Sequence, residues 1–137
     1  MSAFVLDCSI AVAWCFEDEA TPQTDALLDQ LRDEGAAVPA LWPLEVGNAL
    51  LQAERRGRIS TAKVAAFVDL LAGLPIETES DTAQRALREV LALARAERLT
   101  TYDASYLELA GRRALPLATK DQALHQAAQR VGVPLLP

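Results

Sequence analysis

Short hydrophobic runs alternate with longer amphipathic segments along this chain of 137 residues. The short runs predict buried strands at 3–6, 36–38, 76–78 and 115–119, of which the third is the weakest. Parallel strands need a long crossover, usually a helix, and the segments between these runs are long enough to supply one. The alternation is therefore typical of a parallel α/β protein. A chain of this length is expected to form one domain over residues 1–137.

Residues that start and stop helices mark the segments between the strands. Gly35, Gly57 and Gly73 each follow a helical pattern, and Pro43 falls in a first turn, where proline is tolerated. The predicted helices cover 8–16, 22–34, 42–56, 60–72, 81–98, 103–113 and 121–131. The helix at 81–98 is expected to be continuous and amphipathic, and its buried face is expected to contain Ala83, Leu87, Val90, Leu91 and Ala94.

The composition excludes two classes of protein. With 51% hydrophobic residues and a mean hydropathy of +0.11, the chain is too apolar to be disordered. No apolar stretch approaches the ~20 residues that span a bilayer, and the amino terminus lacks the positive charge of a signal peptide. Cys8 and Cys15 lie about 10 Å apart on a predicted helix, too far for a disulfide. We therefore expect free thiols and a cytoplasmic protein.

Four acidic residues interrupt or follow the apolar segments. Asp7 directly follows one predicted strand and Asp121 follows another after Lys120, while Asp103 opens a predicted helix and Glu45 interrupts an apolar stretch. Carboxylates in such places cost desolvation energy unless something binds them. Each also has a purely structural explanation. The three aspartates lie where aspartate commonly caps a helix, and Glu45 could share a solvated polar stripe with Asn48.

Taken together, the four acids predict a metal site. Open parallel sheets bind ligands at the carboxyl ends of their strands, where several of these side chains would meet. Oxygen ligands without cysteine or histidine suit Mg²⁺ or Mn²⁺ rather than zinc. The net charge of −6 argues against broad coating of nucleic acid, but neutralising four acids would leave −2. A metal-dependent nuclease is therefore the leading hypothesis.

Four segments of the chain also resemble a known family. They are residues 4–9, 43–50, 101–110 and 115–121, and the most specific piece is the Tyr-Asp-Ala-Ser-Tyr run at 102–106. With their acidic quartet, these segments resemble PIN domains, and more closely the VapC-type toxin ribonucleases of bacterial toxin–antitoxin pairs. The resemblance implies a compact α/β/α sandwich with a central, mainly parallel sheet. It also implies metal-dependent hydrolysis of RNA phosphodiester bonds.

The resemblance assigns roles to particular residues. The catalytic metal ligands that it implies are Asp7, Glu45 and Asp103, with Asp121 a ligand directly or through water. Ser9 and Thr119 match polar positions near the family's site, and Asn48 is a weaker candidate for a supporting role. The metal implied is Mg²⁺ or Mn²⁺.

The resemblance also implies partners, namely an RNA substrate, a VapB-like antitoxin and a second copy in a homodimer. Trp14 and Phe16 are interpreted either as core residues or as a hydrophobic groove for a partner segment. Attack by water would leave 5′-phosphate and 3′-hydroxyl ends. Because His125 is the only histidine, a mechanism with a pair of histidines is excluded.

Two other functions compete with the nuclease. A phosphate-monoester hydrolase is disfavoured, because the run at 7–9 lacks the second acid of an Asp-x-Asp pair. A non-catalytic PIN-like module that binds a partner or RNA would fit the same residues. A basic cluster is either an RNA contact or a solvated face, and its members are Arg55, Arg56, Arg58 and Lys63. Residue types alone leave open which RNA is cut and how many metal ions bind.

Overall fold

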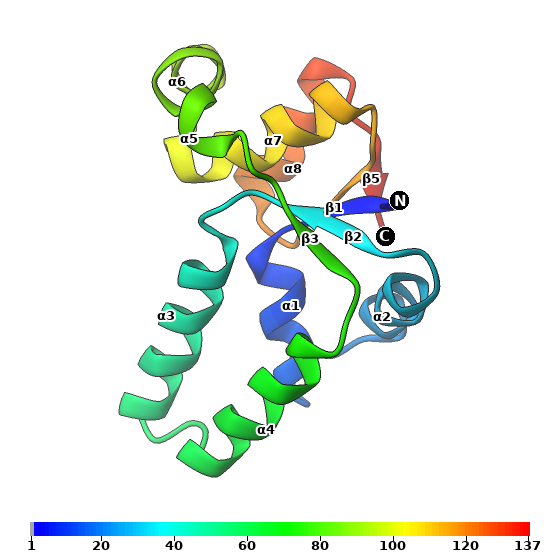
Figure 1. Ribbon diagram of the computed structural model, residues 1–137, viewed down its shortest axis with the longest axis vertical. Coiled ribbons are helices and arrows are strands. Elements are labelled where there is room, and N and C mark those ends of the chain that lie inside the picture. Colours follow the sequence, from blue (N-terminus) through cyan, green and yellow to red (C-terminus); the bar gives the residue numbers. More distant parts are fainter. Residues whose placement is uncertain (1) are drawn as a thin grey trace.

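One parallel sheet runs through the centre of the computed structural model, which describes residues 2–137 (Figure 1). Its strands are β1 (Phe4–Leu6), β2 (Ala36–Val38), β3 (Ile76–Thr78), β4 (Leu117–Ala118) and β5 (Leu135–Leu136). They lie in the order β3-β2-β1-β4-β5, and every pairing is parallel. The chain thus adds β2 and β3 on one side of β1 and then adds β4 and β5 on the other side of β1. Ligands of open α/β sheets bind at such a reversal of strand order, outside the carboxyl ends of the strands.

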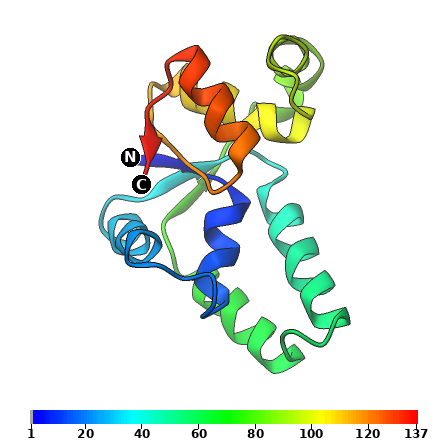
Figure 2. The ribbon, with the colours of Figure 1, turned by 180° about the vertical axis from the view of Figure 1, so that it is seen from behind.

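Helices cover both faces of this sheet. They are α1 (Cys8–Cys15), α2 (Pro22–Glu34), α3 (Trp42–Arg55), α4 (Thr61–Ala72), α5 (Thr82–Arg85), the π-helix η1 (Ala86–Val90), α6 (Leu91–Glu97), α7 (Thr101–Arg113) and α8 (Gln122–Val131). The helices α7 and α8 lie on one face and α1 and α2 on the other, while α3 and α4 form a hairpin that extends away from the sheet (Figures 1 and 2). The expected α/β/α sandwich is confirmed.

The core is centred on β1. Phe4, Val5 and Leu6 are completely buried, as expected for a central strand with both faces covered. Leu31 of α2 and Leu107 of α7 reach the same core from opposite sides. Burying a side chain of this size stabilises the fold by roughly 1.5–3 kcal/mol. The core thereby fixes the position of β1 and of the residue that follows it.

The prediction of one continuous helix at 81–98 is wrong. It is divided into α5, η1 and α6, and the π turn changes which side chains face the core. Val90 and Ala94 are buried as expected, but Leu87 is 82% exposed and Ala83 is exposed. An ion pair between Arg85 and Glu108 of α7, with an N···O distance of 3.2 Å, fastens this segment to the rest of the fold.

Two element boundaries also differ from expectation. The strand expected at 115–119 is limited to β4, because the N–H of Leu115 donates to Ala110 of α7 and Pro116 has no N–H. The helix expected from Asp103 begins at Thr101, and Thr100 is its N-cap. None of the helices within residues 2–137 combines the length and apolar character that crossing a bilayer requires.

Candidate metal centre

Asp7 lies directly after β1, where the strand order reverses. It is 5% exposed, and although it occupies the N-cap position of α1, its side chain makes no capping hydrogen bond. Its carboxylate Oδ2 instead accepts hydrogen bonds from Ser9 Oγ at 2.6 Å and Thr119 Oγ1 at 2.8 Å. A cap therefore does not explain Asp7. Its carboxylate is held in place by two hydroxyls, that of Ser9 in the first turn of α1 and that of Thr119 directly after β4.

The same hydroxyls join the loops after β1 and β4. Ser9 Oγ accepts a hydrogen bond from the backbone N–H of Lys120 at 2.8 Å, and Thr119 Oγ1 accepts one from the N–H of Asp121 at 3.0 Å. Each hydroxyl donates to Asp7 and accepts a backbone N–H of the loop after β4, so it is used both as a donor and as an acceptor. This network fixes Asp121 relative to Asp7. The structure thus places Ser9 and Thr119 in contact with the first of the four acids.

Glu45 lies in the first turn of α3 and is partly buried. Its Oε1 accepts a hydrogen bond of 2.5 Å from the hydroxyl of Tyr106, which is completely buried in α7. Tyr106 is not among the site residues predicted from the sequence. The available signal was its spacing, since Tyr106 is three residues after Asp103 and residues three apart share one face of a helix.

Asp103 and Asp121 each occur in or before the first turn of a helix, but only one of them is a cap. The backbone N–H of Asp103 donates to Thr100 Oγ1 at 3.1 Å, so Thr100 caps α7 and the Asp103 carboxylate has no capping role. Asp121 does cap α8, because its Oδ1 accepts from the N–H of Leu124 at 2.8 Å. The explanation that the aspartate caps a helix is therefore correct for Asp121 and wrong for Asp103.

The four acids are coupled electrostatically. Burial raises the pKa of Asp7, Glu45 and Asp103, that of Asp103 to about 6, and repulsion from other members of the quartet raises each further. The repulsion at Asp103 comes from all three other acids, including Asp121. Such interactions require proximity, so the fold gathers residues from four separate elements at one edge of the sheet.

The cluster fits a hard divalent cation in its donor set. Its ligands would be carboxylate oxygens only, and none of the four acids forms an ion pair with a basic side chain within residues 2–137. Burial and the charges of Asp7 and Glu45 raise the pKa of the Cys8 thiol to about 12, so Cys8 is no competing thiolate ligand. Over the same residues, no three acidic, histidine or cysteine side chains are close enough together to enclose a metal ion. The acids form an open cluster.

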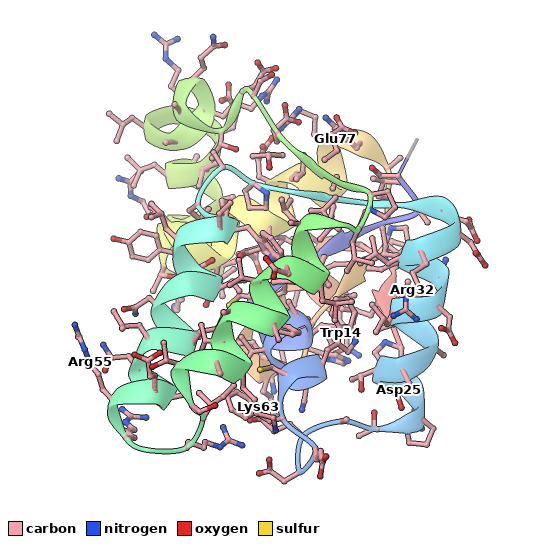
Figure 3. The ribbon with its side chains drawn as sticks, turned by 60° about the horizontal axis from the view of Figure 1, so that its bottom comes forward. Trp14, Asp25, Arg32, Arg55, Lys63 and Glu77 are labelled. Carbon is pink, nitrogen blue, oxygen red and sulfur yellow. The ribbon has the colours of Figure 1, made fainter. Side chains whose placement is uncertain are left out.

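Other residues singled out in the sequence lie away from this cluster. Asn48 is exposed. Trp14 lies between α1 and α2 and donates its indole N–H to the carbonyl of Thr24 at 2.7 Å (Figure 3). Phe16 is buried beneath the guanidinium of Arg58, which lies 3.8 Å from the centre of its ring. Both aromatic residues thus have internal packing roles, and their role as a partner groove stays a prediction.

Arg58 is also fully engaged within the fold. Its guanidinium contacts Asp18 at 2.9 Å and Glu19 at 2.8 Å, which ties the loop after α1 to the turn between α3 and α4. This neutralises one member of the basic cluster. Arg55, Arg56 and Lys63 remain exposed.

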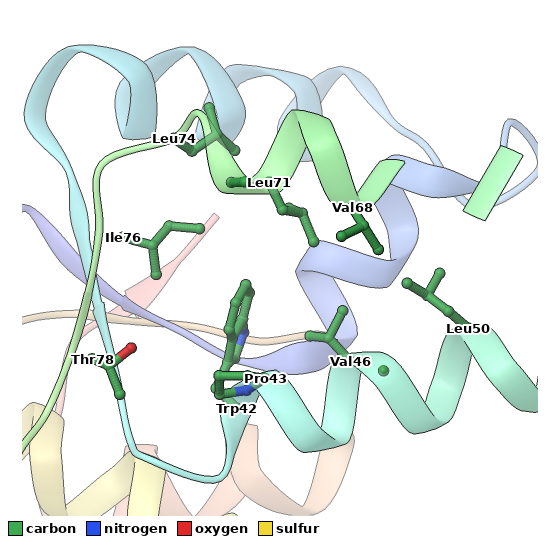
Figure 4. Close-up of a pocket in the computed structure, with 11 residues that line it drawn as sticks. Trp42, Pro43, Val46, Leu50, Val68, Leu71, Leu74, Ile76 and Thr78 are labelled. Atoms are coloured by element: carbon green, nitrogen blue, oxygen red, sulfur yellow. The ribbon is translucent and has the colours of Figure 1, made fainter. Parts of the chain in front are cut away.

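An apolar groove of about 350 Å³ lies between α3, α4 and β3 (Figure 4). Among the side chains that line it are Val46, Leu50, Val68 and Leu71, together with the indole of Trp42. Trp42 is 6% exposed, and its Nε1 has no hydrogen-bond partner within the described part of the chain. This groove is separate from the acids, although Glu45 and Val46 are neighbours in the chain.

Comparisons with known proteins agree with this arrangement. PAE2754 from Pyrobaculum aerophilum has a similar structure, with a TM-score of 0.74 and 27% identity over 98% of this chain and 90% of that one. FitAcB from Neisseria gonorrhoeae shares the fold, with a TM-score of 0.57 and 17% identity over 98% and 96% of the two chains. No curated protein sequence matches the chain. The family model of the PIN domain matches residues 4–130, nearly the whole chain, and the chain therefore belongs to the PIN domain family.

Proposed function

We propose that this protein is a divalent-metal-dependent endoribonuclease of the VapC toxin type. The observation that carries the proposal is the cluster of Asp7, Glu45, Asp103 and Asp121, whose charges repel one another and which form no ion pair with a basic side chain within residues 2–137. PIN domains are generally nucleases and usually use divalent metals, which supports the same function. The resemblance of residues 101–110 to VapC-type toxins supports the choice of RNA as substrate.

The residues at the cluster would have two roles: some would bind the metal ion, and others orient the metal ligands. Asp7, Glu45 and Asp103 would hold Mg²⁺ or Mn²⁺, with Asp121 binding directly or through water. When bound, the cation supplies Lewis-acid activation of water and of the phosphate. Ser9 and Thr119 hold one oxygen of Asp7 in a fixed direction, and Tyr106 does the same for Glu45. Preorganised ligands lose less entropy when the metal and the phosphate bind.

The decisive experiment is cleavage of total bacterial RNA by the purified protein with Mg²⁺ or Mn²⁺ and, separately, with EDTA. Asp7→Asn and Asp103→Asn are expected to abolish cleavage. Asp25→Asn is a matched control, because Asp25 lies in the first turn of α2 as Asp103 does in that of α7, but on an exposed surface. We expect products with 5′-phosphate and 3′-hydroxyl ends. Products with 2′,3′-cyclic phosphates, or equal activity in EDTA, would contradict the proposal.

The biological setting belongs to the same proposal. A VapB-like antitoxin, a homodimer, a cytoplasmic location and one PIN-like domain over residues 1–137 all follow from the resemblance to VapC-type toxins. Light scattering of the purified protein tests the homodimer. Growth of a bacterial host that expresses the chain, with and without the product of the neighbouring gene, tests the toxin and its antitoxin.

A second candidate is a non-catalytic PIN-like module that binds RNA or a protein partner. It is favoured by one observation, the absence of any three acids that already enclose a metal position within residues 2–137. The thermal stability of the protein distinguishes the two. A Mn²⁺-dependent rise in Tm that Asp7→Asn removes supports the nuclease, whereas a Tm indifferent to Mn²⁺ supports the binding module.

A further inference from the structure

A polar cavity of about 350 Å³ lies between the end of α6 and one face of α8. Glu97, Arg98 and Leu99 line it from the α6 side, and Gln126 and Arg130 line it from α8, together with small alanine side chains. Residues 126 and 130 are four apart and therefore share one face of their helix. The cavity is thus built from two elements that are far apart in the sequence.

The cavity carries a net positive charge in an acidic protein. Arg130 Nε donates to Glu97 Oε1 at 2.8 Å, so these two charges offset each other and the guanidinium is held in place. Arg98 is exposed, and no ion pair or side-chain hydrogen bond engages it within residues 2–137. One guanidinium is therefore left free beside a neutral pair and the amide of Gln126. Guanidinium and amide donors suit phosphate oxygens.

Both walls of the cavity are close along the chain to members of the acid cluster. Leu99 precedes Thr100, which caps the helix that carries Asp103. On the other wall, Ala123 is two residues from Asp121, a separation of at most about 8 Å. A nucleic acid strand whose scissile phosphate lay at the acids would bring a neighbouring phosphate within reach of this cavity.

We propose that the cavity between α6 and α8 is a subsite for a backbone phosphate of the single-stranded RNA next to the cleaved bond. Arg98 supplies the charge, and the Arg130–Glu97 pair and Gln126 shape the walls. This inference rests on the proposed nuclease function and adds the residue that positions the strand. It also explains how a protein with a net charge of −6 holds RNA, since one local phosphate contact replaces a broad basic surface.

The backbone of Arg98 permits a test that separates binding from folding. Arg98 has φ 57° and ψ 40°, the left-handed conformation that glycine adopts without strain. Arg98→Gly is therefore expected to keep or raise the Tm while it removes the guanidinium. The probe is a fluorescent ten-nucleotide single-stranded RNA with a 5′-hydroxyl end, so that only internal phosphates are present. Its binding is measured by anisotropy in EDTA, which prevents metal-dependent cleavage, from 25 to 150 mM KCl.

We expect Arg98→Gly to weaken binding at the lowest salt by about tenfold, the equivalent of one charge-assisted hydrogen bond. The slope of log K against log salt should become shallower by about 0.7, the value for one phosphate of a single strand. Arg88→Ala is the matched control, because Arg88 is also exposed and has no ion pair within residues 2–137, but lies in η1 and does not line the cavity. It should change neither quantity.

Three results would overturn the subsite: no RNA binding by the unaltered protein, an unchanged slope in Arg98→Gly, or an equal loss in Arg88→Ala. The last would indicate diffuse electrostatic attraction. A failure of the proposed nuclease function would give a different result from a failure of the subsite. In that case the unaltered protein binds RNA and Arg98→Gly weakens it, but no cleavage follows when Mg²⁺ or Mn²⁺ is added.

Discussion

Asp103 has a carboxylate whose pKa rises to about 6, first through burial and then through repulsion by the other acids. In the unfolded chain the same group titrates near 3.8. The folded protein without metal therefore binds this proton more tightly than the unfolded chain does. Its stability falls as the pH rises from about 3.8 to about 6, and the full penalty is present at pH 7.

Replacing Asp103 with asparagine should therefore stabilise the metal-free protein at pH 7. Because this side chain is partly exposed and water screens its charge, we expect the free energy of unfolding to rise by only about 1 kcal/mol, which corresponds to a Tm higher by about 3 °C. The gain should disappear near pH 3.5, where the carboxyl is protonated in both states. Thermal melts in EDTA at the two pH values measure this.

Added Mn²⁺ should reverse the order of the two proteins, because only the original chain keeps all its ligands. Asp25→Asn, at the exposed equivalent position in α2, should melt like the original protein under every condition. If Asp103→Asn is less stable than the original protein in EDTA at pH 7, the four acids do not repel one another as described.

Tyr106 connects the core to the acid cluster through its hydroxyl. Tyr106→Phe removes the hydrogen bond to Glu45 and leaves the ring in the core, so we expect a loss of about 1 kcal/mol in the free energy of unfolding. The Mn²⁺-induced rise in Tm should also shrink, because Glu45 loses its fixed direction. Tyr102→Phe is the control, since Tyr102 is 64% exposed. Equal responses of the two variants to Mn²⁺ would remove Tyr106 from the site.

Among the elements, the helix expected at 81–98 shows where sequence periodicity fails. Its apolar positions repeat as in a regular helix, but η1 inserts a π turn that periodicity does not encode. The contacts that hold this segment come from outside it, from the Arg85–Glu108 ion pair with α7 and the Arg130–Glu97 ion pair with α8. By contrast, α2 occurs over the expected residues because Thr21 caps its start and Gly35, with φ 80°, ends it. Helix boundaries that depend on nearby capping residues and glycines can be predicted from the sequence, whereas boundaries that depend on contacts with distant residues cannot.

The ion pairs around Glu79 are a further test at the scale of elements. Glu79 follows β3 and is 4% exposed. Its carboxylate accepts a hydrogen bond from Arg112 at 3.1 Å and forms an ion pair with Arg113 at 3.0 Å, and both arginines lie on α7. Glu79→Gln leaves two guanidinium groups without their buried partner, and we expect a loss of about 2 kcal/mol in the free energy of unfolding. Urea unfolding at pH 7 measures it.

The control for this prediction is Glu77→Gln, because Glu77 contacts Arg113 at 2.9 Å but has an exposed side chain. Its cost should be below about 1 kcal/mol. Burial alone would raise the pKa of Glu79, but hydrogen bonds from the Asp81 N–H and Arg112, together with the charges of Arg113 and Arg112, outweigh it and hold the pKa below its usual value of 4.5. The stability it confers is present above pH 4.5 and lost as the pH falls through the lowered pKa. Equal losses in both variants would show that burial does not matter here.

For the whole molecule, the sequence was sufficient to predict a parallel α/β architecture and the acids that meet in it. Strand ends carry Asp7 and Asp121, and parallel strands present those ends at one edge of the sheet. The partners of the acids were harder to predict. Tyr106 reaches Glu45 across 61 positions of the chain, and the cavity at Arg98 exists only because α6 and α8 pack together. Such pairings depend on tertiary packing, which a local pattern does not contain.

The hydrogen bond between Thr119 and Asp7 joins residues 112 positions apart. A ribosome therefore releases Asp7 long before the strand that must lie beside it has been synthesised. Until translation has passed residue 121, β1 lacks β4, and the fourth acid and the two-loop network do not exist. Pairing over such a distance also closes slowly. On the proposed nuclease function, a nascent polypeptide that has not yet passed residue 121 would therefore leave the transcripts around it intact, and cleavage would begin only after that residue has been synthesised.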